Sequence, residues 1–159
     1  MSIPATLTAV DLWTDGACSG NGRKAASPGG WAAILVTGAH HMELSGGEAD
    51  TTNNRMEIVG VVNGLKALDR PCRVRIHTDS SYVMNSATKW IHGWKRRGWK
   101  TAAGKPVANR ELFEELDAEL RRHTVEWVKV DGHRGVELNE RADRLAVAAC
   151  ERYGKRRAA

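Results

Sequence analysis

The sequence predicts an α/β fold in which helices cover both faces of a mixed sheet of five strands. Up to about residue 51, three apolar or β-branched runs are separated by short turns, which is typical of consecutive antiparallel strands. Beyond that point, helical spacing alternates with two further strand-like runs, which indicates crossover connections and parallel pairing. Mixed pairing of this kind places helices on both sides of the sheet.

The first three expected strands cover residues 7–14, 31–36 and 41–45. The first mixes apolar and β-branched residues and stops at Asp15, where an Asp-Gly pair predicts a turn. The second is a continuous apolar run, which favours a central position in the sheet. The third follows a short turn that contains a glycine, so the three strands form an antiparallel meander.

The second half of the chain predicts alternating helices and strands. A helix begins near Thr52 or Asn53, either of which can cap it, and its apolar residues recur at helical spacing. Residues 74–78 form a strand that ends at Asp79, and Ser80 and Ser81 can cap a short helix after it. The remaining expected elements are a helix near residues 109–122, a strand at 125–130 and a helix at 138–149.

Length and composition indicate one globular domain. The chain has 159 residues, of which 42% are hydrophobic and 27% charged, and no linker or internal repeat interrupts it. We expect residues 1–159 to form a single domain with an ordered core at about 7–153 and a basic tail at 154–159. The net charge of +5 gives a moderate bias toward an anionic partner.

Cysteines and the amino terminus point to a cytoplasmic protein. Cys18, Cys72 and Cys150 are odd in number and widely spaced, which argues against a disulfide framework or a zinc site. Cys72 and Cys150 are best interpreted as buried apolar residues. The first residues lack a basic flank and an apolar run, and no stretch is long enough to span a bilayer. No obligate protein partner is evident, and we expect a monomer.

Four carboxylates occupy positions that suit a metal site. Asp15 and Asp79 each follow a threonine at the predicted carboxyl end of a strand, where α/β proteins place their ligand sites. Glu57 and Asp143 border the apolar stripes of their helices. Taken singly, each is explained by a cap, a turn or a surface charge. If they converge, their repulsion requires protons or a cation, and oxygen ligands favour magnesium or manganese over zinc.

Six motifs in register resemble the bacterial type 1 ribonuclease H family over nearly the whole chain. They are Thr14-Asp15-Gly16-Ala17-Cys18, Thr51-Thr52-Asn53-Asn54-Arg55-Met56-Glu57, Thr78-Asp79-Ser80, Trp90-Ile91-His92-Gly93-Trp94, Gly132-His133 and Asn139-Glu140-Arg141-Ala142-Asp143. The resemblance implies a ribonuclease H-like fold whose five-stranded mixed sheet agrees with the pattern above. It also implies an endonuclease that hydrolyses the RNA strand of RNA–DNA hybrids and leaves 5′-phosphate and 3′-hydroxyl ends.

The resemblance implies a catalytic set as well. Asp15, Glu57, Asp79 and Asp143 would hold two Mg²⁺ ions, with Asp15 bridging them and Mn²⁺ as a possible substitute. His133 would assist proton transfer or product release, for which its near-neutral reference pKa is suited. Without the motif, a single loop histidine would be interpreted as a surface residue.

Contacts to the hybrid duplex follow from the same resemblance. Selectivity for RNA depends on the 2′-hydroxyl, which Glu57 would read at the cut site. The residues that resemble the family's minor-groove contacts are Cys18, Asn21, Asn53, Asn54, Arg55 and Ser81. Thr52 and Arg55 would also hold a phosphate of the DNA strand. For the asparagines, helix capping remains an alternative or additional role.

A basic, tryptophan-rich segment resembles the protrusion with which the family grips the DNA strand. Its cations include Lys95, Arg96 and Arg97, and its aromatic residues are Trp90, Trp94 and Trp99. Trp90 and Trp94 are one helical turn apart, so packing is an equally good explanation for them.

Three departures from the family pattern bear on these contacts. Gly93 replaces a frequent asparagine, Asp131 replaces a common lysine, and residues 22–27 form a longer loop that leaves the assignment of Asn21 open.

Three other functions remain as alternatives. A resolvase or integrase of the same fold would cleave branched DNA. A protein that binds hybrids without cutting would be expected to lack a carboxylate, and a generic basic RNA-binding domain would need no metal. The intact carboxylate set and the Thr51–Glu57 motif favour the nuclease.

Overall fold

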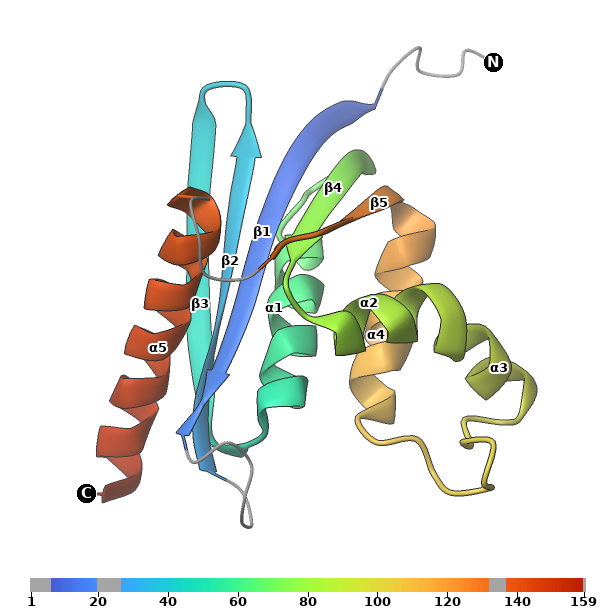
Figure 1. The fold of residues 1–159 in the computed structure, drawn as a ribbon. Helices are drawn as coiled ribbons and strands as arrows, with labels where there is room; N and C mark the ends of the chain where they lie inside the picture. The colour runs from blue at the N-terminus through green and yellow to red at the C-terminus, as the bar shows by residue number, and fades with distance from the viewer. Residues whose placement is uncertain (1–6, 20–26, 132–136, 159) are drawn as a thin grey trace.

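One five-stranded sheet forms the centre of the protein (Figure 1). The computed structural model describes residues 7–19, 27–131 and 137–158. The strands are β1 (Thr8–Cys18), β2 (Ser27–Thr37), β3 (His40–Thr51), β4 (Cys72–Thr78) and β5 (Thr124–Lys129), in the spatial order β3-β2-β1-β4-β5. β1, β2 and β3 pair antiparallel, whereas β4 is parallel to β1 and to β5. The predicted mixed sheet is therefore confirmed.

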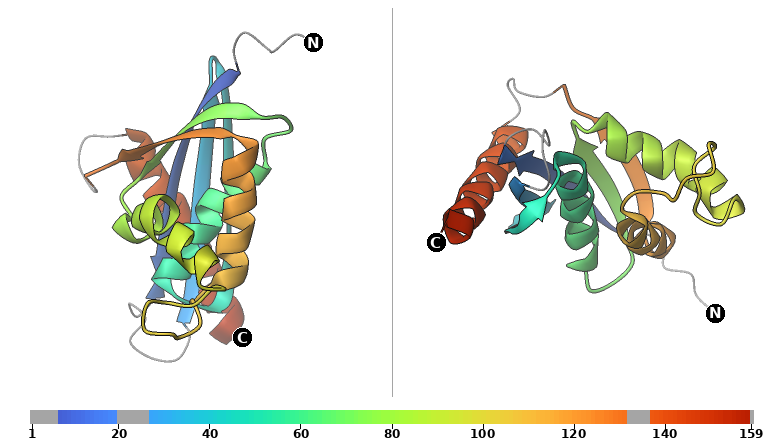
Figure 2. Two further views of the ribbon diagram at one scale, coloured as in Figure 1. Left: turned by 90° about the vertical axis from the view of Figure 1, so that its right-hand side faces the viewer. Right: turned by 90° about the horizontal axis from the view of Figure 1, so that it is seen from below.

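The helices lie on both faces of this sheet. They are α1 (Asn53–Lys66), α2 (Ser81–Asn85), the π-helical turn η2 (Ser86–Trp90), α3 (Ile91–Arg96), α4 (Arg110–Arg122) and α5 (Glu137–Ala158). α5 packs against β1, β2 and β3, and α1 packs against β1 and β2 with α4 beside it. Figure 2 shows α5 on the opposite side of the sheet from α1 and α4, with α2, η2 and α3 leading away from the end of β4.

Alternation along the strands divides the core in two, because successive side chains point to opposite faces. On the α1 face, Leu12 and Ala33 belong to the larger cluster, which also includes Phe113 of α4. On the α5 face, Ala32 and Ile34 pack against small residues of α5 such as Ala146. The strands that carry the site are thus fixed from both sides.

Several elements are longer than the sequence predicts. β2 and β3, for example, cover Ser27–Thr37 and His40–Thr51 instead of residues 31–36 and 41–45. β1 does not stop at Asp15 but pairs with β2 as far as Cys18, because the hairpin partner satisfies its backbone and overrides the turn tendency of Asp15-Gly16. α5 continues to Ala158, beyond residue 149 where the predicted helix ends.

Two sequence expectations about the chain as a whole can be compared with the structure. Cys72 and Cys150 are buried and form no disulfide, as predicted. No helix in the described ranges combines the length and apolar character needed to cross a membrane.

Candidate active site

Carboxylates from separate elements meet at one place near the carboxyl end of β4. Asp15 comes from β1, Glu57 from α1 and Asp79 from the residue after β4, and one oxygen of each lies within 4.8 Å of the others. Asp15 and Glu57 are each only 5% exposed. Asp143 of α5 lines the same hollow of about 380 Å³ as Asp15 and Asp79. The tertiary structure therefore brings together all four carboxylates that the sequence singles out.

Local structure fixes where these carboxylates lie. The Thr52 hydroxyl accepts a hydrogen bond from the backbone N–H of Arg55 at 3.1 Å and caps α1 directly before Glu57. A Cβ at Gly16 would lie 2.7 Å from the Glu57 backbone nitrogen, so glycine allows α1 to approach β1 here. The Lys129 ammonium donates to the Asp79 carbonyl at 2.8 Å and ties the end of β4 to β5.

Burial and mutual repulsion make this cluster unfavourable when it is ionised. The pKa of Asp15 rises from 3.8 to about 8, mainly because burial removes water and then because of the charge of Asp79. The pKa of Glu57 is raised well above its usual value by burial and by the charges of Asp15 and Asp79. The backbone N–H of Gly16, which donates to Asp15 Oδ1 at 2.9 Å, offsets only part of this.

The donor set fits a divalent cation. Glu57 Oε2 is buried and has no hydrogen-bond partner within the described part of the chain, so this oxygen remains available as a ligand. Carboxylate oxygens are the ligands that hard cations prefer, and a cation would reverse the repulsion that raises the pKa values of Asp15 and Glu57. These residues can therefore hold a divalent metal ion.

Three residues that sequence reasoning did not assign to the site also line this hollow, namely Asn139, Glu140 and Arg144. Asn139 is 4% exposed, and no hydrogen bond to its Oδ1 is found among the described residues. Asn139 and Glu140 belong to the motif that ends at Asp143, so their position in that motif was the available signal. Arg144 is exposed, and no sequence pattern indicated it.

The polar residues expected to contact the duplex lie around the starts of α1 and α2. Asn53 and Asn54 are exposed in the first turn of α1, and Ser81 is exposed at the start of α2. The capping hydroxyl belongs to Thr52, which resolves the choice between Thr52 and Asn53. The half-buried Cys18 thiol lies 3.6 Å from the carbonyl oxygen of Thr51, directly before this group.

Arg55 is held by carboxylates rather than standing free. Its Nε donates to Glu48 Oε1 at 2.9 Å, and its Nη1 donates to Glu111 Oε1 at 2.6 Å. A longer contact of 3.4 Å joins Nη1 to Asn109 Oδ1. A phosphate bound by Arg55 would therefore have to share the guanidinium with two carboxylates.

The basic segment forms η2, α3 and the loop after it. Trp94 is buried against Phe113 with ring centroids 5.1 Å apart, whereas Trp90 is 44% exposed. Trp99 adopts a positive φ of 65° and lies under the guanidinium of Arg110, which is 5.6 Å from the ring centroid. Trp90 and Trp94, which have the same helical spacing in the sequence, thus occupy different environments.

Not all cations of this segment are equally available. Lys95 forms an ion pair of 3.0 Å with Asp117, and Arg97 donates to the Lys100 carbonyl at 3.1 Å. Arg96 is exposed. His133 and Asn21, which the sequence also assigned to the site, lie outside the described residues.

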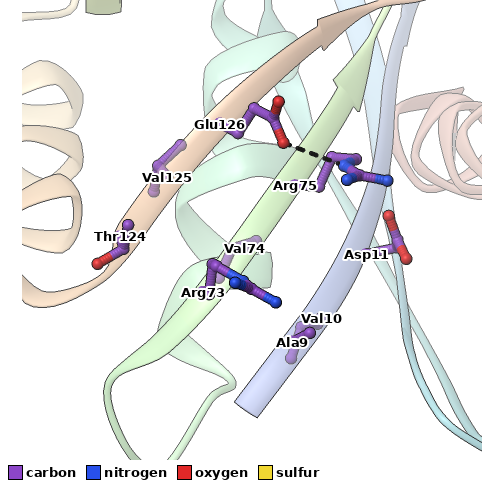
Figure 3. Close-up of a pocket in the computed structure, with 9 residues that line it drawn as sticks. All are labelled: Ala9, Val10, Asp11, Arg73, Val74, Arg75, Thr124, Val125 and Glu126. Carbon is purple, nitrogen blue, oxygen red and sulfur yellow. Dashed lines mark hydrogen bonds and ion pairs between the residues drawn. The ribbon is translucent and has the colours of Figure 1, made fainter. Parts of the chain in front are cut away.

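A second hollow, of about 350 Å³, lies over the amino ends of β1, β4 and β5 (Figure 3). Arg73 and Arg75 extend over it, and Arg75 is paired with Glu126 at 3.2 Å. Because β1, β4 and β5 are mutually parallel, this hollow lies at the end of the strands opposite to the four carboxylates. It is therefore separate from the candidate active site.

Comparison with known proteins matches this arrangement of sheet, helices and carboxylates to one family. The family model for RNase H matches residues 8–151. The chain belongs to the ribonuclease H family. A ribonuclease H from Phenylobacterium zucineum is 58% identical over 86% of this chain and 87% of its own length. Another, from Rhizobium meliloti, is 54% identical over 94% of this chain and 95% of its own.

Solved structures agree with this assignment. A type 1 ribonuclease H that carries the type 2 active-site motif matches with a TM-score of 0.84 and 33% identity, over 96% of this chain and 76% of its own. A ribonuclease H1 in complex with an RNA/DNA hybrid matches over 90% of this chain and 97% of its own at 21% identity and a TM-score of 0.63, which shows the common fold. This ribonuclease H is accordingly an enzyme that hydrolyses the RNA strand of RNA–DNA hybrids.

Proposed function

We propose that the enzyme cuts the RNA strand with two Mg²⁺ ions, which Asp15, Glu57, Asp79 and Asp143 would hold. The observation that carries this is the meeting of three carboxylate oxygens within 4.8 Å, two of them from nearly buried residues. Mn²⁺ has similar ligand preferences and is expected to substitute. The products carry 5′-phosphate and 3′-hydroxyl ends.

The chain's own residues position the reacting groups. When bound, two divalent ions activate the attacking water and stabilise the leaving oxygen. Asp15 and Glu57 would hold those ions where the scissile phosphate is to bind, and the burial of both carboxylates excludes competing water. Asp143 closes the side of the hollow formed by α5. His133 would assist proton transfer or product release, for which its near-neutral reference pKa is suited.

Recognition of the hybrid would use the polar residues next to the cluster. Glu57 and its neighbours at the start of α1 contact the 2′-hydroxyl and the minor groove, because only the 2′-hydroxyl distinguishes RNA from DNA at one position. The contact set is Cys18, Asn21, Asn53, Asn54, Arg55 and Ser81, with Thr52 and Arg55 on a DNA phosphate. The exposure of Asn53, Asn54 and Ser81 supports this assignment. A structural neighbour solved with a bound RNA/DNA hybrid is consistent with this partner.

The first experiment measures substrate and metal dependence together. Labelled RNA–DNA, RNA–RNA and DNA–DNA duplexes of one sequence are incubated with Mg²⁺ and wild-type enzyme, Asp15→Asn or Asp69→Asn. Asp69 is a matched control because its side chain is 83% exposed and its carboxylate pairs only with Arg70 among the described residues. We expect cleavage of only the RNA strand of the hybrid, lost in Asp15→Asn and retained in Asp69→Asn. Hybrid binding without cleavage by the wild type would support a binding protein instead.

A second experiment tests the grip on the DNA strand. Replacing Lys95, Arg96 and Arg97 by glutamate is expected to weaken hybrid binding and to flatten its salt dependence, since each lost phosphate contact reduces the slope of log K against log salt by about 0.9. Arg70→Glu, at an exposed site in the loop before β4, serves as the control for altered net charge. A slope equal to that of the wild type in the triple variant would remove this segment from the binding surface.

We also infer that the enzyme acts in the cytoplasm as a monomer. Two buried cysteines that form no disulfide, Cys72 and Cys150, suit a reducing compartment. Light scattering after size-exclusion chromatography tests the monomer, and a stable dimer at enzyme-assay concentrations would contradict it.

A further inference from the structure

The ladder between β1 and β4 ends in a pair of stacked rings. Trp13 and His77 are register partners, and they form the last pair between these strands in the residues the structure describes. Their ring centroids are 3.8 Å apart and their planes differ by 6°. His77 Nε2 also lies 2.8 Å from Asp11 Oδ1. The nearly buried ring of His77 is therefore held at its face by Trp13 and at its edge by Asp11.

This pair lies next to the carboxylate cluster, two residues before Asp15 along β1 and, at the end of β4, two residues before Asp79. Residues two apart on a strand point to the same side of a sheet, so Asp15 follows Trp13 on the face that the stack occupies. Asp79 follows His77 two residues later, just beyond the end of β4. After this last pair the strands separate: Asp15 continues in β1 opposite Ala32 of β2, whereas the chain after Asp79 turns into α2. The stack is thus the last register pair of β1 and β4 before Asp15 and Asp79 in the described residues.

We propose that the Trp13–His77 stack, braced by Asp11, positions Asp15 and Asp79 at the spacing that a divalent cation requires. The proposal rests on the metal site proposed above. Carboxylate ligands need a fixed separation, and removing the groups that support metal ligands typically weakens metal affinity by about 10–100-fold. Two rings in face-to-face contact resist sliding and twisting of the strands more than a pair of small side chains would. His77 is in this view a positioning residue that touches neither substrate nor metal.

The test separates the ring from the hydrogen bond. His77→Gln removes the stacked ring while leaving an amide that can reach Asp11, whereas His77→Phe keeps a flat ring and loses the bond. Ile76→Val is the matched control, because Ile76 is the buried neighbour whose side chain points to the other face of β4. Its substitution lowers stability without touching the stack.

The measurement is calorimetric titration of Mn²⁺ or Mg²⁺ into substrate-free protein, with circular dichroism to confirm folding. We expect His77→Gln to bind the metal about tenfold more weakly than the wild type, and His77→Phe and Ile76→Val to remain within about twofold. In hydrolysis assays, the loss in His77→Gln should be recovered by raising the metal concentration, whereas Ile76→Val, which lowers stability away from the stack, should need no more metal than the wild type.

Several outcomes would overturn the proposal. Equal metal affinity in His77→Gln and the wild type would do so, as would a loss in His77→Phe as large as that in His77→Gln. If His77→Gln does not fold, Trp13→Leu removes the other ring of the stack from a half-buried position in β1, and an unchanged metal affinity there would also overturn it. A wild-type protein that binds no metal would instead disprove the metal site itself.

Discussion

Replacing Asp15 by asparagine should abolish catalysis and at the same time stabilise the metal-free protein. The carboxyl of Asp15 has a folded-state pKa of about 8 against an ordinary value of 3.8. Between these two values the folded state binds more protons than the unfolded state, so stability falls as the pH rises from about 4 to about 8 and then levels off. Asparagine has no charge to bury, and its carbonyl oxygen can still accept the hydrogen bond from Gly16.

The magnitude follows from proton linkage. One proton changes the unfolding free energy by about 1.4 kcal/mol per pH unit, so the metal-free wild type should lose up to about 3 kcal/mol between pH 5 and pH 7 through this one group. Asp15→Asn avoids that loss. For a chain of this size, about 3 kcal/mol corresponds to a difference in Tm of roughly 6–12 °C.

The assay is thermal unfolding in a chelator at pH 5, 6, 7 and 8, with wild type, Asp15→Asn and the exposed control Asp69→Asn. The difference in Tm between Asp15→Asn and the wild type should widen as the pH rises. Added Mg²⁺ should narrow this difference, because it stabilises only the wild type, by about 2.7 kcal/mol at a metal concentration 100 times Kd. Parallel Tm curves for the two proteins across this pH range would refute the argument that burial of charge destabilises the site.

Two further predictions concern how α5 is held against the sheet. Glu43, whose pKa is lowered to about 2 mainly by its hydrogen bonds from Arg141, contributes stability above its ordinary pKa of 4.5 that is lost as the pH falls toward 2. Urea midpoints at pH 7, 4 and 3 should therefore decline more steeply for the wild type than for Glu43→Gln, and equal slopes would contradict this. Gly30→Ala should destabilise the fold by about 1–3 kcal/mol, because the new Cβ would lie 2.2 Å from the Ala146 carbonyl oxygen. Gly154 lies in α5, the helix that contains Ala146, and a Cβ there would meet only Pro28 Cγ at 3.6 Å. Gly154→Ala should therefore be neutral or stabilising, and similar Tm values for the two variants would count against this explanation.

Much of the local structure was predictable because it depends on neighbouring residues. The helical spacing after Thr52 and the capping hydroxyl before Glu57 are properties of a few consecutive positions, and both are confirmed. The strand ending before Asp79 is likewise where the sequence placed it. The resemblance to ribonuclease H also depended on short motifs, and the family comparison confirms it over residues 8–151.

Features that depend on distant partners were beyond the sequence pattern. The turn tendency of Asp15-Gly16 predicted an end to the first strand, but pairing with β2 carries that strand on to Cys18. Trp90 and Trp94 have the same helical spacing, and only the position of α4 decides that Trp94 is buried against Phe113. The carboxylates that hold Arg55 also come from β3 and α4, which no local pattern links to it.

The sequence by itself determined which carboxylates to consider, the elements that carry them and the family to which the chain belongs. Only the tertiary structure decided that Asp15, Glu57 and Asp79 lie within 4.8 Å of one another, and that the Trp13–His77 stack lies next to them. The physical reason is that periodicity reports which face of an element a side chain occupies. Convergence, by contrast, requires β1 to pair with β4, and this contact between segments far apart in the chain forms only when the whole sheet assembles.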